Sequence, residues 1–369
     1  MVVLTVNTGS SSIKLAAFAS DASGLRVCGA ARYASDATDP GEQLKIFMQQ
    51  HAPASPDVIA HRVVHGGARL TSPRRIDAAV EAEIERIAPL APLHNPLALT
   101  WIRACRTVFG AEVSQVAVFD TAFYASLPEV ATTYALPHEL STRYEVRRYG
   151  FHGLAHQAMC QRWQALRPDI AGGGRVISFQ LGAGCSVTAS ERGIARDTSM
   201  GFSPMEGLVM ATRSGDIDPG LVTYMQQALG LSAEQVAQLL NHQSGLLGVS
   251  GISGDMRTLL ASDEPRARLA VALYCYRARK YLGAYLAVLG GADAILFGGG
   301  VGENAAPVRA AILEGFEWAG MRLDATANQA ATGREGCISA ADSRMQAWVV
   351  PVDEAHILAR EGHAVMVGY

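Results

Sequence analysis

Apolar and polar positions alternate in blocks that outline one recurring unit along the chain. Near the start, VVLTV and IKLAAF flank the polar segment NTGSSS, which predicts two strands joined by a tight turn over residues 2–18. RVISFQLGAGCSVTAS predicts the same unit at 175–190, and ADAILFGGGVGENAA (292–306) leads a third apolar run into a glycine-rich turn. Because the strand–turn–strand unit occurs twice, we expect a duplicated core with a ligand between the halves.

Between these units, apolar positions recur every three to four residues, which indicates amphipathic helices. The longest apolar segment, 268–289, is interrupted by Arg277, Arg279 and Lys280, so it fits a buried helix better than a membrane span. Strands alternating with helices predict an α/β fold. The other predicted helices cover residues 81–93, 96–109, 221–229, 233–243 and 307–320.

Length and composition set the broad class. The 369 residues are enough for two ordinary domains, and 49% of them are hydrophobic, which suits a protein with a sizeable core. A formal net charge of −3 favours neither nucleic acid nor an anionic membrane as a partner. The six cysteines form no CxxC pair and no signal peptide is visible, so we expect reduced thiols and a cytoplasmic location.

Four residues stand where a strand end or a turn would expose them to a ligand. Arg62 in HRVVHGG precedes two glycines, and Asp120 in VAVFDTAF follows an apolar run. His152 lies between Phe and Gly in RRYGFHGLAH, and Arg213 precedes a turn. Each also has a plain structural interpretation, as packing or an incidental charge. The two glycine-rich turns could bind anions through their backbone, and the two arginines could bind a carboxylate or a phosphate. His152 could donate a hydrogen bond, and Asp120 is an acid. Phosphoryl transfer requires groups of these kinds.

Motifs for competing chemistries are absent from the sequence. The chain contains no GxxxxGK[ST] loop, no GxGxxG fingerprint, no GxSxG elbow and no HExxH helix. Two further readings stay open on the residues alone. One is a nucleotide-binding protein with little or no turnover, and the other is a sugar kinase.

The order of these segments resembles the acetate kinase family. The resemblance runs from residue 7 to about residue 355, and it is carried by NTGSSSIK, HRVVHGG, PLHNP, VFDTAF, RRYGFHG, SMGFSPMEGL, SGLLGVSGIS, GGGVGEN and PVDE. It implies the fold of sugar kinases, actin and heat-shock chaperones. That fold has duplicated ribonuclease-H-like α/β domains, mixed sheets with flanking helices, and a cleft between the domains. The domains expected here are residues 1–121 with 356–369, and residues 122–355.

The resemblance also implies roles for individual residues. Asn7 and Glu354 would hold Mg²⁺, with Mn²⁺ as an alternative, and Asp120, His152 and Arg213 would be catalytic. The acyl substrate would contact Arg62 through its carboxylate, and Val64, Leu93, His94, Phe151 and Pro204. The nucleotide would contact Ser10, Ser12, Lys14, Gln180, Leu181, Gly182, Ala183, Gly184, Asp255, Met256, Arg257, Gly300, Val301, Gly302, Glu303 and Asn304.

The implied reaction is reversible phosphoryl transfer between ATP and acetate, which gives acetyl phosphate and ADP by direct in-line attack. Two alternatives follow from the same resemblance, because some members of the family use other substrates. The acceptor could be propionate or another short carboxylate, and the donor could be pyrophosphate. A homodimer is expected, with no nucleic acid or membrane as a partner.

Six positions depart from the usual pattern of the family. Gln180 and Ala183 stand where HLGNG is usual, Ala211 replaces a glycine, Gly254 replaces a serine, and Leu154 and Ala155 replace two residues with hydroxyl groups. Losing one hydrogen bond to a charged group costs roughly 1.5–3 kcal/mol. The changes at Gln180 and Ala183 would therefore weaken ATP binding or change the phosphoryl donor without abolishing activity by themselves.

Overall fold

The computed structural model describes all residues except 10–11, 22–23, 35–38, 53, 93 and 369. The chain divides into two compact units. Unit 1 comprises Met1–Ala125, Phe151–Leu154 and Asp353–Tyr369, and unit 2 comprises Ser126–Gly150 and Ala155–Val352. The predicted domain boundaries lie at 121/122 and 355/356, whereas unit 1 also includes residues 151–154 and begins again at Asp353.

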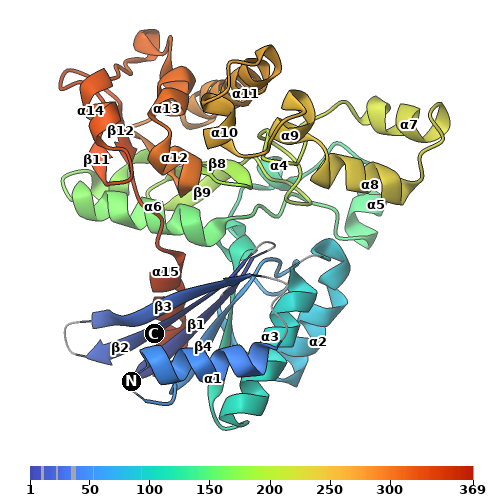
Figure 1. The fold of residues 1–369 in the computed structure, drawn as a ribbon, viewed down its shortest axis with the longest axis vertical. Coiled ribbons are helices and arrows are strands. Elements are labelled where there is room, and N and C mark those ends of the chain that lie inside the picture. The colour runs from blue at the N-terminus through green and yellow to red at the C-terminus, as the bar shows by residue number, and fades with distance from the viewer. Residues whose placement is uncertain (10–11, 22–23, 35–38, 53, 93, 369) are drawn as a thin grey trace. The chain divides into compact units, whose positions relative to one another are not determined.

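A six-stranded mixed sheet in the order β3-β2-β1-β4-β6-β5 forms unit 1 (Figure 1). Its strands are β1 (Val2–Thr8), β2 (Ser12–Asp21), β3 (Gly24–Ala34), β4 (Val58–Val63), β5 (Arg74–Arg75) and β6 (Ser114–Phe119). The first three strands are antiparallel, and β1, β4 and β6 are parallel neighbours. The helices of the unit are α1 (Pro40–His51), α2 (Ala78–Arg86), η1 (Ala88–Leu90), α3 (Asn95–Phe109), η2 (Asp120–Tyr124) and α15 (Glu354–Val367).

Side-chain alternation assigns each face of this sheet to different helices. Leu4 and Val6 pack with Phe47 of α1 and Trp101 of α3 in one buried cluster. Residues of β1 on the opposite face, including Asn7, therefore point to the side that α15 covers. Figure 1 shows α1 and α3 on one face of the sheet and α15 on the other.

The sheet of unit 2 repeats this topology with different strands. Its order is β11-β12-β10-β7-β8-β9, and from β9 onward it has the same sequence of antiparallel and parallel neighbours as unit 1. The strands are β7 (Arg175–Leu181), β8 (Cys185–Glu191), β9 (Ile194–Thr198), β10 (Ala294–Gly298), β11 (Gly336–Cys337) and β12 (Gln346–Val349). The predicted α/β fold with duplicated mixed sheets is confirmed.

Most helices lie in unit 2, and the predicted helices appear with shifted ends. The predicted helix 81–93 ends at Arg86 and continues as η1, and 307–320 ends at Leu313 because Gly315 adopts a φ of +77°. None of the helices in the described residues has the length and hydropathy needed to span a membrane. The helices that complete the list are α4 (Glu129–Thr132), α5 (His138–Arg143), α6 (Gly153–Leu166), η3 (Ala171–Gly173), α7 (Pro219–Gln227), α8 (Ala233–His242), α9 (Gly245–Ser250), α10 (Met256–Leu260), α11 (Pro265–Leu289), α12 (Gly299–Asn304), α13 (Ala306–Leu313), η4 (Glu317–Ala319) and α14 (Ala325–Ala330).

A buried histidine in the first sheet makes unit 1 sensitive to acid. His61 lies in β4, and its Nε2–H donates to Oε1 of Gln115 at 2.7 Å. Its Nδ1 is buried and has no hydrogen-bond partner in the described part of the chain. Burial lowers the pKa of His61 to about 4, so the ring is neutral at pH 7.

We predict that the free energy of unfolding falls as the pH drops from 6.5 to 4.5. The unfolded chain binds a proton at His61 with a pKa near 6.5, whereas the folded chain resists protonation until about pH 4. Between these values the unfolded state binds more protons, so His61 contributes a loss of roughly 2.5 kcal/mol. Urea unfolding at pH 7 and pH 4.5 measures this loss. His61→Gln keeps an amide donor for Gln115 but does not titrate, so it should lose about that much less; equal losses in both proteins would contradict the prediction.

Candidate functional site

Three polar side chains meet at the carboxyl ends of adjacent parallel strands in unit 1. Asn7 is near the end of β1, Arg62 is near the end of β4, and Asp120 directly follows β6. Asn7 and Arg62 are register partners, and the last pair of β4 and β6 is Val63 with Phe119. All three side chains point to the face that α15 covers. Open α/β sheets bind ligands at this edge.

Arg62 connects the other two residues. Its Nε and Nη2 donate to Oδ1 and Oδ2 of Asp120 at 3.0 and 2.6 Å, and its Nη1 donates to Oδ1 of Asn7 at 3.0 Å. Asp120 is fully buried, and burial raises its pKa while the Arg62 charge opposes that rise. One N–H on Nη1 and one on Nη2 have no hydrogen-bond partner in the described part of the chain. Arg62 therefore presents one pair of donors to a small anion while the rest of its fork is held.

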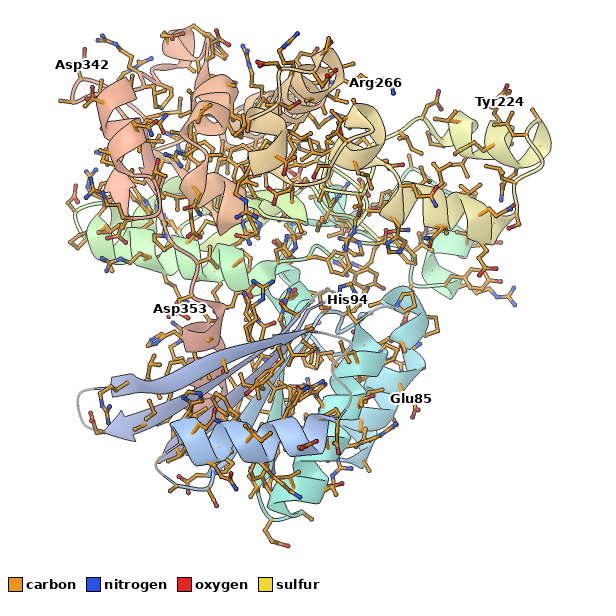
Figure 2. All side chains as sticks on the ribbon, in the orientation of Figure 1. Glu85, His94, Tyr224, Arg266, Asp342 and Asp353 are labelled. Atoms are coloured by element: carbon orange, nitrogen blue, oxygen red, sulfur yellow. The ribbon has the colours of Figure 1, made fainter. Side chains whose placement is uncertain are left out.

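Glu354 completes the group from the first turn of α15. Its Oε2 accepts from Nδ2 of Asn7 at 2.7 Å and lies 4.0 Å from Nη1 of Arg62. Burial opposes its ionisation, but Arg62, Lys14 and the Asn7 hydrogen bond outweigh burial, so the pKa of Glu354 lies below its usual range. The carboxylate is thus charged at neutral pH, and Figure 2 shows Asp353, the residue before it, where α15 begins.

His152 is held against Asp120 by an unusual backbone. It has a φ of +58°, a left-handed conformation that costs a non-glycine residue energy and often marks a functional site. The next residue must be glycine, because a Cβ on Gly153 would lie 1.9 Å from the carbonyl oxygen of Asp120. On the other side, the hydroxyl of Tyr124 donates to the carbonyl of Phe151 at 2.8 Å. The His152 backbone also hydrogen-bonds the Asp120 carboxylate.

The expected acyl pocket is only partly located. Val64 and Phe151 are buried in unit 1, Pro204 belongs to unit 2, and Leu93 lies outside the described residues. His94 is half-buried at the start of α3, where Figure 2 labels it. The described members of this set in unit 1 are therefore Val64, Phe151 and His94.

Asn95 and His65 are two polar residues of this region that the sequence analysis missed. Asn95 is fully buried; its Oδ1 accepts from the backbone N–H of His65, and its Nδ2 donates to the His65 carbonyl. The His65 ring accepts from Gly67 N at Nδ1 and packs edge-on to Phe151. Burial lowers the pKa of His65 to about 4, so it too is neutral. The Asn-Pro pair after His94 is the one local sequence feature that could have drawn attention to Asn95.

The first glycine-rich turn, within the strand–turn–strand unit at 2–18, is described in part. Ser10 lies outside the described residues, Ser12 is buried at the start of β2, and Lys14 is exposed and pairs with Asn7 across the hairpin. The charge of Lys14 reaches Glu354, as the lowered pKa of that carboxyl shows. The predicted strand–turn–strand unit therefore places a cation beside the acidic group.

The second glycine-rich turn occupies the equivalent place in unit 2. Gln180 and Leu181 end β7, and the turn Gly182–Gly184 closes with a bond from Gly182 N to Gly184 O of 3.0 Å. Gln180 pairs with Gly298 of β10, as Asn7 pairs with Arg62 in unit 1. Its Oε1 is buried without a hydrogen-bond partner among the described residues. This strand end thus offers backbone and amide groups in place of charges.

Arg213 lies in a loop that follows β9. Its Nη1 donates to the carbonyl of Pro204 at 3.0 Å, and burial lowers its pKa. The loop is held by the start of α9, where a Cβ on Gly245 would lie 2.2 Å from the carbonyl oxygen of Met210. The glycine in SGLL is therefore required for the close approach that places Arg213.

A half-buried polar group that the sequence analysis missed supports the same loop. Nη2 of Arg148 donates to Oε1 of Glu206 at 2.6 Å, and the Tyr134 hydroxyl bonds to the other oxygen of Glu206. Tyr134 also accepts from Phe202 N, and Arg148 lies over the Tyr134 ring. These partners are 58 to 72 residues apart in the chain, so no local sequence pattern predicts their contact.

The remaining nucleotide candidates lie in two turns of unit 2. Asp255 caps α10 and forms an exposed pair with Arg257, which lowers the pKa of Asp255 to about 2, while Met256 is buried. Gly300, Val301 and Gly302 lie in α12.

Two polar side chains of the turn at 300–304 form hydrogen bonds with nearby backbone groups. Glu303 accepts from Gly299 N and Val352 N, and Asn304 donates to the Gly300 carbonyl. They shape the turn from within.

Comparison with known proteins identifies the family. A sequence model of the Acetokinase family matches residues 41–360. An acetate kinase from Solibacter usitatus is 48% identical over 314 residues, which cover 84% of this chain and 76% of that protein. The chain belongs to the acetokinase family.

Solved structures of the family agree with the fold. The crystal structure of Porphyromonas gingivalis acetate kinase matches with a TM-score of 0.89 at 34% identity, over 99% of both chains. A propionate kinase from Francisella tularensis matches with a TM-score of 0.89 at 33% identity, also over 99% of both chains. The predicted family and enzyme class, a kinase, are confirmed.

Three of the departures from the usual family pattern are neighbours in unit 2. The backbone N–H of Ala211 donates to the Ala183 carbonyl at 3.0 Å. A Cβ on Gly254 would lie 2.9 Å from the Ala211 carbonyl oxygen and 3.4 Å from its Cβ. A side chain at 254 would therefore press against the backbone carbonyl of Ala211 and touch the Ala211 side chain.

We predict that Gly254→Ser destabilises the protein and that Ala211→Gly relieves part of the cost. The added side chain overpacks against the Ala211 carbonyl, which costs roughly 1–3 kcal/mol. Glycine at 211 frees that backbone to shift and removes the neighbouring Cβ. In a double-mutant cycle on the free energy of unfolding, we expect a favourable coupling of about 1 kcal/mol. Gly283→Ser with Ala211→Gly is the control, since a Cβ on Gly283 meets nothing within 4 Å. Additive effects of Gly254→Ser and Ala211→Gly would show that the two positions do not share space.

Proposed function

We propose that this protein is an ATP-dependent acetate kinase that interconverts ATP and acetate with ADP and acetyl phosphate. The observation that carries the proposal is the Arg62 fork, which is held by Asp120 and Asn7 and has two N–H groups left to bind a carboxylate. Membership of the acetokinase family supports the same reaction. Localisation in the cytoplasm and assembly as a homodimer are part of this proposal.

The acceptor needs no general base. Acetate is already ionised at neutral pH, so its oxygen attacks the γ-phosphorus directly, the bond from that phosphorus to the β-phosphate oxygen breaks, and ADP leaves with both electrons. Charge and atoms balance without a proton transfer. We therefore assign Asp120 the task of orienting Arg62, which binds the acetate, with the acyl methyl group against Val64 and Phe151. His152 and Arg213 would donate to the phosphoryl oxygens.

The donor set in unit 1 fits Mg²⁺. Glu354 is an ionised carboxylate, and the amide oxygen of Asn7, which accepts one hydrogen bond from Arg62, keeps a second lone pair. Oxygen atoms of this kind are the ligands that Mg²⁺ prefers. Groups of three or more His, Cys, Asp or Glu that could hold a metal are absent from the described residues. That suits Mg²⁺, which takes one or two carboxylates and fills its other positions with water and substrate phosphates. When bound, the ion neutralises phosphate charge; Mn²⁺ is an alternative in the same role.

The nucleotide would bind to unit 2. The turns at 180–184 and 300–304 offer backbone N–H groups and small side chains, which allow phosphates and a nucleoside to approach closely. Ser12 and Lys14 of the first turn would add contacts to the phosphates. Asp255 and Arg257 are exposed near the start of α10 and would contact the nucleoside.

Two alternatives concern the substrates. Propionate as acceptor is supported by the similarity to the Francisella tularensis propionate kinase. Pyrophosphate as donor is supported by Gln180 and Ala183, which replace two polar groups usual in the second turn.

The first experiment traps acyl phosphate as its hydroxamate. Acetate, propionate and butyrate are each tested with Mg²⁺ and either ATP or pyrophosphate. Turnover of acetate with ATP at the highest kcat/KM supports the proposal, and turnover only with pyrophosphate would replace ATP as donor. If folded protein forms no hydroxamate with any combination of acid and donor, the result would favour a nucleotide-binding protein without turnover.

We predict that Arg62→Lys raises the KM for acetate at least tenfold. A lysine ammonium is a point charge and cannot hold Asp120 and a second carboxylate in the planar fork. Asp120→Asn should lower kcat roughly 10²-fold, because Arg62 loses its charged anchor. Steady-state kinetics measures both. Arg69→Lys is the control, since the Arg69 side chain is 63% exposed; an unchanged KM in Arg62→Lys would remove Arg62 from the acetate site.

A further inference from the structure

Unit 2 contains an arginine that is fully buried without a carboxylate partner. Arg309 lies in α13, and its side chain is among the largest that are fully buried. In the described part of the chain, all its hydrogen-bond acceptors are neutral oxygens. Burial lowers its pKa to about 10, so it still carries a charge at neutral pH. A buried charge of this kind is costly and calls for a physical explanation.

Two of the acceptors belong to the turn proposed to bind the nucleoside. Nη1 of Arg309 donates to the carbonyls of Gly302 and Glu303 at 2.8 and 3.0 Å. These carbonyls lie in the last turn of α12. The carbonyls of the last turn of a helix have no N–H partner within the helix, and a positive charge near them is favourable. The guanidinium thus closes the end of the segment Gly300–Asn304.

The other acceptors fasten Arg309 to a second buried residue. Its Nε donates to Oδ1 of Asn328 at 2.8 Å, and its Nη2 donates to the Asn328 carbonyl at 2.6 Å. Nδ2 of Asn328 in turn donates to the Ala306 carbonyl at 2.9 Å. Arg309 and Asn328 therefore join α12, α13 and α14 into one polar cluster, in which four of the five guanidinium N–H groups have partners.

Replacing Arg309 by an apolar side chain would leave the Gly302 carbonyl without this donor. Glu303 would keep one partner for its carbonyl, because Gly333 N also donates to it at 3.0 Å. At the other end of the turn, the Glu303 carboxylate holds Gly299 N and Val352 N. The turn is thus fixed from both ends, by the Glu303 carboxylate at one and by the Arg309 guanidinium at the other.

We infer that Arg309 is a positioning residue that sets the shape of the turn Gly300–Asn304 and, through it, the affinity for the nucleoside part of the phosphoryl donor. This inference rests on the proposed function. Arg309 need not touch the nucleotide; it acts by holding the backbone that does. A residue with only a stabilising role would change the amount of folded enzyme, which alters the apparent kcat but not the KM of either substrate.

Kinetics of three variants tests the inference. Arg309→Gln should raise the KM for ATP and for ADP at least tenfold while the KM for acetate and for acetyl phosphate stays within twofold. Arg309→Lys keeps the charge but cannot reach all four acceptors, so its KM for ATP should lie between the wild type and Arg309→Gln. Asn328→Ala removes one acceptor of Arg309 and should show a smaller rise of the same kind, which keeps the test valid if Arg309→Gln does not fold.

Arg162→Gln is the matched control, because Arg162 is an arginine of unit 2 that pairs with Glu335 at the surface, and its KM values should not change. Competitive inhibition by adenosine gives a second readout, which should weaken in Arg309→Gln in step with ATP. Equal changes in the KM of ATP and acetate, or a fall in kcat alone, would overturn the inference. Failure of the wild type to form acetyl phosphate from ATP would instead overturn the proposed function, so the two failures are distinguishable.

Discussion

The bidentate pair between Arg62 and Asp120 is the interaction on which the site in unit 1 depends. Two buried charges at the ends of neighbouring strands are tolerated because each satisfies the other and because Asn7 occupies a further donor of the fork. Glu354 then lies close enough to be kept ionised by the same cation. Removing Asp120 would leave a buried cation with an unsatisfied fork, and removing Arg62 would leave two carboxylates facing each other. The group therefore acts as one electrostatic unit.

The two halves of the chain use the same topology for different chemistry. In unit 1 the strand ends carry Asn7, Arg62 and Asp120, whereas in unit 2 the equivalent register pair is Gln180 with Gly298. Charged side chains suit a small carboxylate and a cation, which need fixed charges. Glycine and amide groups suit a polyphosphate and a flat base, which need backbone contacts and space. In the proposed function, the duplicated scaffold would thus hold two unlike substrates without a change in its sheets.

The sequence predicted the parts of this structure that local patterns encode, and long-range partners account for the rest. The hairpin at 2–18, the strand before Asp120 and the buried helix at 268–289 follow from periodicity over a few residues. Arg62, Asp120 and Glu354 could be named from motifs, but their mutual geometry could not, since 58 residues separate the first two. The sequence analysis did not identify Asn95, Glu206 and Arg309 for the same reason. Each has partners in another segment. The motif that assigns Glu303 to the nucleotide also does not reveal that its carboxylate binds the backbone N–H of Gly299.

The hydrogen bond from Asn7 to Glu354 spans 347 positions of the chain. During synthesis the ribosome releases the first sheet long before the helix that covers its functional face. Until α15 emerges, β1, β4 and β6 expose one side of their hydrophobic strands, and the Arg62–Asp120 pair lacks Glu354 as a neighbour. This uncovered face is open to aggregation for as long as α15 has not been made. A chain that stops before residue 354 therefore lacks both Glu354 and the helix that covers this face.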